Sequence, residues 1–587
     1  MPSSPPAVRV VVAGGGIAGM TAALRLAERG YQVTLYEAKP WLGGNLSSHQ
    51  DEASGVYHDV YPHMFSNFYV NFWEIVEKDL GMRRDDTPES DFAVREGIQT
   101  LTHDGGWQRL RNATSADASA LISDMRSGVA GMSPADMYLY LYSLLDLIVH
   151  RFDIRGMLGA SLNDFIRSRP CNTTKVATLH DQIVMFIWSI HSPATSAASF
   201  KSFYRHAFGN TRPLLWLLKG SLAEKIIMPL EQRLEKLGCT VKKGVMLHSL
   251  TVDNGRVTDL EFRVAKFNRE THELAASGKV VPSEPFDHVV LALPPDALGE
   301  VADRGPVASR QLTAVMPKLA HAGKRLPSEP IAVMDLYITR KLPNIPDENI
   351  MALDSDCYFS IIDLSQLWPA LQAEKDLTAL TLASSDYWAL PSDSDKHNAH
   401  HLILELHSYV GGFNPGKHWG DPEADIDWKR SHFHSNKDEV IFVNQVGSWA
   451  YRPKAHSPAV ENLFFAGDFC RNHVDMATVE AAVTSGINAA AALQAAAPMG
   501  EPIVALKSPM WSLRALCALK MLLAPSAYAA KAVVTLGEIA AGRQHGDPHV
   551  SVPHRLTTLW SLPAAYVVDM AETAASIWVG SDDDRTV

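Results

Sequence analysis

The sequence predicts an α/β protein, because strand and helix patterns alternate at both ends of the chain. Near the N-terminus an apolar, β-branched strand at 8–13 is followed by a glycine-rich turn, an alanine-rich helix over Met20–Arg29 and a second strand at 32–36. Near the C-terminus an apolar strand at 461–466 is followed by an alanine-rich helix over Met476–Leu493. Short apolar strands that alternate with amphipathic or buried helices are typical of parallel sheets.

The first turn has the glycine spacing of a phosphate-binding loop. Gly14 permits a tight turn, Gly16 lets the backbone approach a pyrophosphate, and Gly19 lets helix and strand pack closely. The N-terminus of the helix that follows offers free N–H groups and a positive dipole end to the phosphates. Glu37 ends the second strand, where an acid can accept both ribose hydroxyls. This unit therefore predicts a dinucleotide site formed by Gly14, Gly16, Ile17, Ala18, Gly19, Glu37 and Ala38.

Further segments indicate which dinucleotide is bound. Residues 43–45 supply a second glycine pair, where backbone can again lie against a cofactor, and the strand at 461–466 closes on Gly467-Asp468. With these segments in this order, the chain resembles the FAD-dependent amine oxidase and phytoene desaturase superfamily over residues 8–495. The resemblance is closest to plant-type phytoene and ζ-carotene desaturases and to hydroxysqualene dehydroxylases.

The resemblance implies FAD and assigns residues to it. Asp468 would bind the flavin side chain or pyrophosphate, and the Val479 N–H would face the flavin N1/O2 edge, where reduced flavin is negative. The backbone of Leu247 would bind the adenine, within a strand pair expected over 241–262. Asn45 stands where many amine oxidases have arginine. Beyond the first loop, the expected FAD contacts are Gly43, Gly44, Asn45, Tyr61, Pro62, His63, Met64, Leu247, Gly467, Asp468, Thr478 and Val479.

One histidine is a candidate catalytic residue. The resemblance places His63 beside the flavin, where it would orient substrate or move a proton; a histidine bonded to backbone is the alternative. The other histidine groups, at 397–407 and 432–434, lack carboxylate or cysteine partners at a metal-ligand spacing. No metal site is expected.

The predicted architecture is a Rossmann-like FAD-binding domain of the GR2 flavoprotein type, with an inserted α+β substrate domain and a helical C-terminal extension. The FAD-binding domain is assembled from residues 8–100, 222–300 and 440–495. The substrate domain takes 101–221 and 301–439, and the extension takes 496–587. Within the substrate domain, 115–219 is expected to be mainly helical, whereas 329–410 contains strands at 331–339 and 377–383.

The amino-acid composition limits the kinds of partner and the cellular compartment that the protein is expected to have. The 587 residues include 53 basic and 65 acidic side chains, a net charge of −12 that argues against binding nucleic acid. The five cysteines are scattered, with no CxxC spacing, which suits a reducing compartment. The N-terminal residues lack a basic region ahead of an apolar one, so no secretory signal is expected. We therefore expect a cytoplasmic protein, with its oligomeric state left open.

The apolar insert favours a hydrophobic substrate. Residues 137–145, 183–188 and 213–218 form apolar runs that are expected to be helical; such runs usually line ordinary core, but their concentration favours an apolar tunnel. We expect hydride removal from an isoprenoid or other lipid, forming a carbon–carbon double bond, with quinone or oxygen as electron acceptor. The alternatives are an amine oxidase that uses oxygen and a non-catalytic flavoprotein.

The extension has two interpretations of equal weight. Residues 509–523 are amphipathic and too short to span a bilayer, which needs about twenty apolar residues. They would lie on the inner face of a membrane, with Arg514 and Lys520 at head-group level and Trp511, Leu516 and Leu523 below. Alternatively, they form a helical lid on the protein's own surface.

Overall fold

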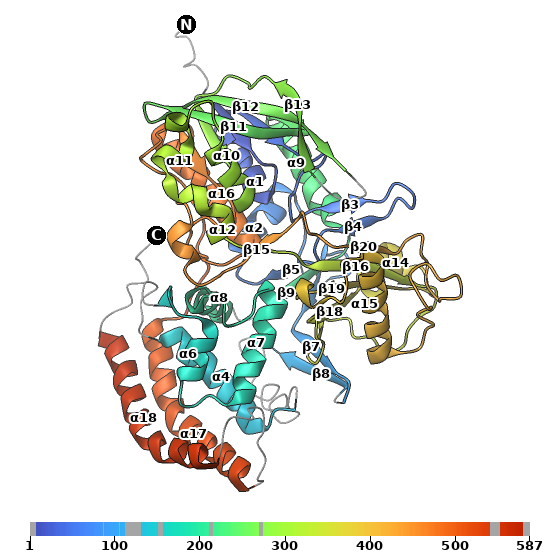
Figure 1. Cartoon of the computed structure of the whole chain (residues 1–587), viewed down its shortest axis with the longest axis vertical. Coiled ribbons are helices and arrows are strands. Elements are labelled where there is room, and N and C mark those ends of the chain that lie inside the picture. The colour runs from blue at the N-terminus through green and yellow to red at the C-terminus, as the bar shows by residue number, and fades with distance from the viewer. Residues whose placement is uncertain are drawn as a thin grey trace.

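The computed structural model describes residues 8–85, 87–104, 106–111, 131–150, 157–209, 215–268, 274–540 and 552–578. Figure 1 shows sheets and helices from both ends of the chain at the top, a large sheet at the right and a helical region at the bottom. The two C-terminal helices form the outer layer of that helical region.

A five-stranded parallel sheet organises the upper region. Its strands are, in spatial order, β10 (Thr240–Lys243), β2 (Gln32–Glu37), β1 (Arg9–Ala13), β14 (His288–Leu291) and β22 (Leu463–Phe465). Every neighbouring pair is parallel, and the strands come from three distant parts of the chain. The predicted α/β class and Rossmann-like arrangement are confirmed, whereas the exact domain boundaries stay a prediction.

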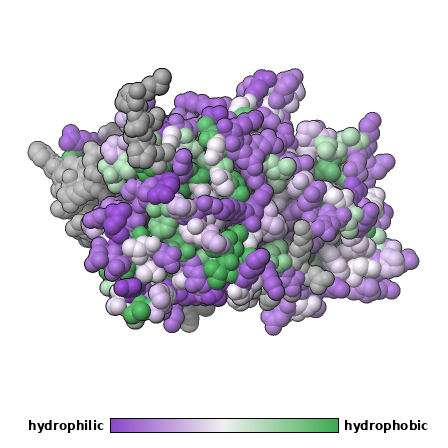
Figure 2. All heavy atoms as spheres, turned by 90° about the horizontal axis from the view of Figure 1, so that it is seen from above, coloured by the Kyte–Doolittle hydropathy of each residue, from purple (hydrophilic) through white to green (hydrophobic). Residues whose placement is uncertain are grey.

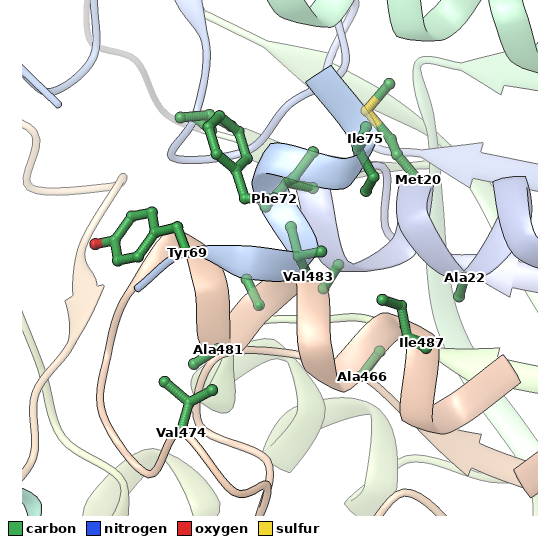
Figure 3. Close-up of a cluster of buried hydrophobic side chains, with 14 of the residues drawn as sticks. Met20, Ala22, Tyr69, Phe72, Ile75, Ala466, Val474, Ala481, Val483 and Ile487 are labelled. Carbon is green, nitrogen blue, oxygen red and sulfur yellow. The ribbon is translucent and has the colours of Figure 1, made fainter. Parts of the chain in front are cut away.

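Helices from opposite ends of the chain pack together beside this sheet. They are α1 (Ile17–Ala27), α2 (Val70–Glu74) and α16 (Val479–Ala496). Figure 3 shows Met20 of α1, Phe72 of α2 and Val483 of α16 in one buried apolar cluster. This packing brings the start of the first helix and the start of the last helix into the same part of the molecule.

An antiparallel sheet covers the top. It consists of β11 (Val245–Asp253), β12 (Arg256–Phe267) and β13 (Leu274–Val281). The strand pair expected over 241–262 is present, with a longer second strand. The helices α9 (Met228–Lys236) and α10 (Pro295–Asp303) flank this region.

The second large sheet has seven strands. In spatial order they are β20 (His432–His434), β16 (Ala332–Ile338), β19 (Thr378–Ser384), β18 (Phe359–Asp363), β17 (Ile350–Ala352), β7 (Gly97–Thr102) and β8 (Gly106–Arg111). The strands expected at 331–339 and 377–383 are confirmed. The helix α15 (Asp395–Val410), which was not predicted, packs Leu402 and Leu406 against this sheet.

A three-stranded sheet lies between the upper region and the helical region below it (Figure 1). Its central strand β9 (Leu215–Leu218) pairs with β5 (Met64–Ser66) on one side and β6 (Phe92–Arg95) on the other. The helix expected over 213–218 is therefore wrong for 215–218, because backbone pairing on both edges overrides the uniform apolar pattern; 213–214 lie outside the described residues. Two hairpin strands, β3 (Ser48–Gln50) and β4 (Tyr57–Asp59), lie nearby.

The helical insert is confirmed where it is described. It contains α4 (Pro134–Val149), α6 (Leu162–Ser168), α7 (Thr174–Trp188) and α8 (Ala197–Gly209). Ser133 and Asp136 form a capping box at the start of α4, and Thr173 caps α7, which explains where both helices begin. The expected helical stretch also includes 115–130, which lies outside the described residues.

The C-terminal extension is a helical hairpin of α17 (Leu513–Ala540) and α18 (Val552–Trp578). Among the described residues, α17 alone has the length and apolar composition needed to cross a membrane. The predicted placement of two of its residues is wrong. Lys520 is buried and ion-paired to Asp146 and Asp569, each at 2.6 Å, and Leu516 is buried in the core, because α17 packs along α4.

Candidate FAD site

The first glycine loop is shaped for close backbone contact. Gly14 has φ +109°, and a Cβ atom there would lie 2.1 Å from the carbonyl oxygen of Ala292. A Cβ atom at Gly19 would lie 2.0 Å from the Gly14 carbonyl oxygen. Glycine is therefore required at both positions, for the turn and for the approach of helix to strand, as the spacing predicts.

The second glycine loop lies directly against the first. The Gly43 N–H donates to the Gly15 carbonyl at 2.8 Å, and Gly16 and Gly43 form an isolated parallel bridge. Gly16 is the N-cap residue of α1, and no side chain caps the first turn of this helix. The N–H groups of Ile17 and Ala18 thus remain available to an anion such as a pyrophosphate.

Glu37 is fixed by two backbone donors. Its Oε2 accepts from the Gly15 N–H and its Oε1 from the Lys39 N–H, both at 2.7 Å. Burial raises the pKa of Glu37, and these N–H groups oppose that rise. The side chain is only half-buried, so the carboxylate retains surface with which to accept ribose hydroxyls.

The C-terminal acid also keeps surface free. Asp468 is half-buried, and burial raises its pKa to about 6, although the Arg452 charge lowers it. Arg452 is buried and donates to the carbonyls of Phe469 and Cys470 and to the carboxylate of Asp475. The arginine therefore fixes the loop that carries Asp468. The sequence alone assigned no role to Arg452.

The start of α16 has a partly open set of N–H groups. Thr478 caps α16 by accepting from the Ala481 N–H at 3.2 Å, which leaves the Val479 N–H free of that cap. Glu480, in the first turn, accepts from the backbone N–H groups of Asn71 and Phe72, each at 3.0 Å, and so joins α16 to α2. The sequence analysis missed Glu480. The signal that could have revealed it is an acidic residue in the first turn of a helix that is otherwise rich in alanine.

The remaining predicted contacts lie on neighbouring segments. Asn45 donates to the Val440 carbonyl at 3.1 Å, and the Tyr61 hydroxyl donates to the Glu439 carbonyl. Leu247 packs in the same buried cluster as Ala13 and Tyr36, beside the first loop. Glu439 itself is buried between Lys39 and His49, which outweigh the effect of burial and lower its pKa to about 2.

His63 lines a small cavity between strand β9 of the three-stranded sheet and strands β18 and β19 of the seven-stranded sheet. Its Nδ1–H donates to the Tyr61 carbonyl at 2.8 Å, and burial lowers the pKa of His63 to about 4. The imidazole is therefore neutral, with its lone pair on Nε2. The cavity, of about 30 Å³, has room for one water molecule. Its lining residues are Asp59, Pro62, His63, Leu217, Leu218, Gly220, Leu222, Ile362, Leu364, Leu367, Trp368 and Thr381.

The residues present fit FAD. Two uncapped or partly capped helix starts suit the pyrophosphate and the flavin N1/O2 edge, and two half-buried acids retain accepting surface for hydroxyl groups. Among the described residues, no group of three or more histidine, cysteine or acidic side chains could hold a metal ion. Met64, on β5, completes the segment expected to pass the flavin.

This arrangement makes the protein an FAD-dependent oxidoreductase. Residues 17–494 match the model of flavin-containing amine oxidoreductases, and the chain belongs to that family.

Its curated relatives include carotenoid enzymes. ζ-Carotene desaturase of Synechocystis is 25% identical over 268 residues, which cover 44% of this chain and 53% of the relative. 4,4'-Diaponeurosporene oxygenase of Staphylococcus aureus is 23% identical over 343 residues, covering 53% of this chain and 64% of the relative. The chain thus spans roughly half to two thirds of the length of these two relatives.

Solved structures share the fold. Cyclohexylamine oxidase from Brevibacterium oxydans superposes with a TM-score of 0.53 at 15% identity, covering 83% of this chain and 99% of that one. At this identity the similarity supports the architecture alone.

Proposed function

We propose that the protein removes a hydride from an apolar chain, of isoprenoid or other lipid type, to form a carbon–carbon double bond. The observation that carries the proposal is the aliphatic wall of the cavity beside His63, where Leu217, Leu222 and Leu367 lie among its lining residues. Such a wall suits a hydrocarbon better than a polar substrate. The similarity to carotenoid enzymes supports the same substrate class.

FAD, when bound, supplies the hydride acceptor. The protein must then hold the substrate, exclude water and take a proton. Aliphatic side chains from β9 and from α13 (Leu364–Leu367) line the cavity. Because the cavity has room for one water molecule in this structure, these side chains would move apart to admit a chain and would then position it by contact area. His63 is neutral and keeps an accepting nitrogen, so it would orient a water molecule or the substrate.

Anaerobic mixing with candidate substrates tests this function. We expect a carotene precursor or squalene derivative to bleach the visible flavin band, because two electrons pass to FAD without oxygen. Polyamines are mixed with the protein in the same way to test the alternative, which is an amine oxidase that passes electrons to oxygen. Bleaching by amines but by no lipid would contradict the proposal. Dithionite bleaching without reduction by either class would favour a non-catalytic flavoprotein.

We also propose that the outer face of the C-terminal hairpin lies on a membrane. Trp560 on α18 and Leu522 on α17 are 85% and 76% exposed, and Val533 and Val567 are also exposed. Among the described residues of α17 after Arg514, none of the exposed side chains is charged. The upper face in Figure 2 is instead mainly hydrophilic, with smaller hydrophobic groups between. An apolar helical face of this kind favours a lipid surface.

The hairpin would lie on the bilayer rather than cross it. One face of α17 is already buried against the protein, through Cys517, Ala524 and Ala527, so only the other face can meet lipid. A substrate dissolved in the bilayer would then reach the enzyme without crossing water. Quinone, which partitions into the same layer, is our proposed electron acceptor, with oxygen as the alternative.

Vesicle flotation tests the membrane proposal. Replacing Leu522 and Trp560 together by glutamate is expected to lower vesicle binding at least tenfold, since each buried side chain contributes about 1.5–3 kcal/mol. The matched control is Val280→Glu, an exposed apolar residue on β13 at the opposite end of the molecule. Both variants should retain FAD. If the wild-type protein fails to float with neutral and with anionic vesicles, the hairpin is a lid or an assembly surface. Deleting the hairpin is a weaker test, because it would uncover buried residues of α4.

A further inference from the structure

The cavity beside His63 is lined by one carboxylate, that of Asp59. Asp59 ends β4 and lines the cavity together with His63 and the aliphatic wall. Its Oδ1 accepts from the Ser48 hydroxyl at 2.6 Å and from the Leu222 N–H at 3.0 Å. Among the described residues, no hydrogen bond is formed by Oδ2. The side chain is half-buried, so one carboxylate oxygen is held and the other retains surface.

Contacts connect this cavity to the cofactor loops. The Ser48 hydroxyl, which donates to Asp59, also accepts from the Ala223 N–H at 2.9 Å. Ala223 begins the short π-helix η2 (Ala223–Ile227), and Ile227 lies so close to Gly43 that a Cβ atom on that glycine would be 2.9 Å from its side chain. Asp59 is thus joined through one hydrogen-bonded segment to the second glycine loop.

We propose that Asp59 is the proton acceptor of the dehydrogenation. This inference rests on the proposed function and deepens it. One C–H bond of the substrate would break with its electron pair leaving as hydride to FAD. The neighbouring C–H bond would break with its proton passing to the Asp59 carboxylate, while its electron pair forms the new double bond. A water molecule in the cavity would then carry the proton away and restore the carboxylate.

The surroundings suit such a base. Burial raises the pKa of Asp59 to about 7, while the Ser48 and Leu222 hydrogen bonds lower it. The negative charge of Asp335, on β16 of the seven-stranded sheet, raises the pKa of Asp59. The charge of His58, which is bonded to Asp335 at 2.8 Å, lowers that pKa. A carboxylate with a pKa near the working pH is a more effective base than an ordinary one.

The other ionisable groups on the elements that pack around the cavity are exposed, are paired with other residues or do not titrate near pH 7. On η2, Glu224 is exposed and Lys225 pairs with Asp91 at 3.2 Å. Asp363, at the start of α13, accepts from Ser365 and Gln366. His63, with a pKa of about 4, stays neutral above pH 5. Burial also raises the pKa of Glu480 to about 7, but Glu480 bonds to Asn71 and Phe72 and does not line this cavity. A pH dependence near 7 that Asp59→Asn abolishes would therefore come from Asp59.

The test uses Asp59→Asn in the FAD-loaded protein. Asparagine preserves the shape and the Oδ1 acceptor for Ser48 and Leu222 but cannot take a proton. We expect anaerobic flavin reduction by the lipid substrate to slow by about 10²-fold or more. In the wild type this rate should rise with pH, with its midpoint near 7, and level above that, and in the variant that dependence should vanish. FAD content and reduction by dithionite should be unchanged.

A matched variant and a direct titration separate catalysis from structure. Ser48→Ala removes a hydrogen bond that lowers the pKa of Asp59, so the pH profile should move to higher pH while the plateau rate persists. Because Glu480 also titrates near pH 7, the infrared measurement compares the two proteins. The spectrum of the wild type minus that of Asp59→Asn should show a protonated carboxyl signal that disappears as the pH rises through about 7, whether or not substrate is present.

The outcomes distinguish the two proposals. If lipids reduce the wild type and Asp59→Asn equally, with the same pH profile, Asp59 is not the base and the proposed function stands. If the wild type and Asp59→Asn show the same carboxyl titration near pH 7, the inference also fails by itself. If no lipid reduces the wild type but amines do, both fail. Weaker amine binding in Asp59→Asn would then assign the carboxylate to pairing with a substrate ammonium group.

Discussion

Replacing Gly19 by alanine is expected to lower FAD affinity by about tenfold to a hundredfold. The added Cβ atom would lie 2.0 Å from the Gly14 carbonyl oxygen, so α1 or the first loop must shift. Overpacking of this kind costs about 1–3 kcal/mol, and here the displaced backbone is the part that would hold the pyrophosphate. The measurement is FAD released per protein after dialysis and denaturation, together with a binding titration of the cofactor-free protein.

Gly278→Ala is the matched control. A Cβ atom at Gly278, on β13, meets nothing within 4 Å, and this glycine is not among those with positive φ. This variant should bind FAD as the wild type does. Equal affinity in Gly19→Ala would show that the close approach of α1 to the first loop is not needed for FAD binding.

Replacing Lys520 by methionine should loosen the C-terminal hairpin. Lys520 is 2% exposed, and its ammonium group joins Asp146 of α4 to Asp569 of α18. Removing one partner from a buried ion pair costs about 3–5 kcal/mol, because it leaves buried charge uncompensated. Arg169 contacts both carboxylates and would offset part of the loss. We therefore expect the lower end of that range.

Hydrogen exchange measures this loosening. Amides of α17 and α18 should exchange about 10²-fold faster in Lys520→Met, since each 1.4 kcal/mol is a factor of ten, while amides of α1 and FAD content stay unchanged. Arg514→Met, an exposed cation near the start of the same helix, is the control. Unchanged exchange in Lys520→Met would mean that apolar packing alone holds the hairpin.

The sequence was most informative where function depends on backbone. Gly14 and Gly19 need glycine because a Cβ atom would meet a carbonyl oxygen, and such a constraint leaves its own pattern in the chain. Glu37 could be identified because it ends the second strand, which places its carboxylate next to the first loop. The whole βαβ unit is local in sequence, so its geometry follows from residues that are neighbours along the chain.

Apolar composition was less reliable. The run at 215–218 resembles a buried helix, yet it is the central strand β9, because partners from 64–66 and 92–95 pair with both of its edges. Periodicity cannot separate a short buried strand from a buried helix, since both are apolar on all sides. In the extension, Lys520 was expected at a membrane surface but lies in a buried ion pair with Asp146, more than 370 positions away.

The sequence by itself determined the cofactor class and the family and predicted the residues of the first glycine loop, because these depend on short segments whose backbone geometry restricts the residue types. Only the tertiary structure revealed the groups that meet across the chain: Asp59 with His63 and the wall from β9 and α13, Arg452 with the loop of Asp468, and Lys520 with Asp146 and Asp569. Their pKa values and pairings depend on burial and on partners distant in sequence. Those quantities exist only once the separate segments have packed together.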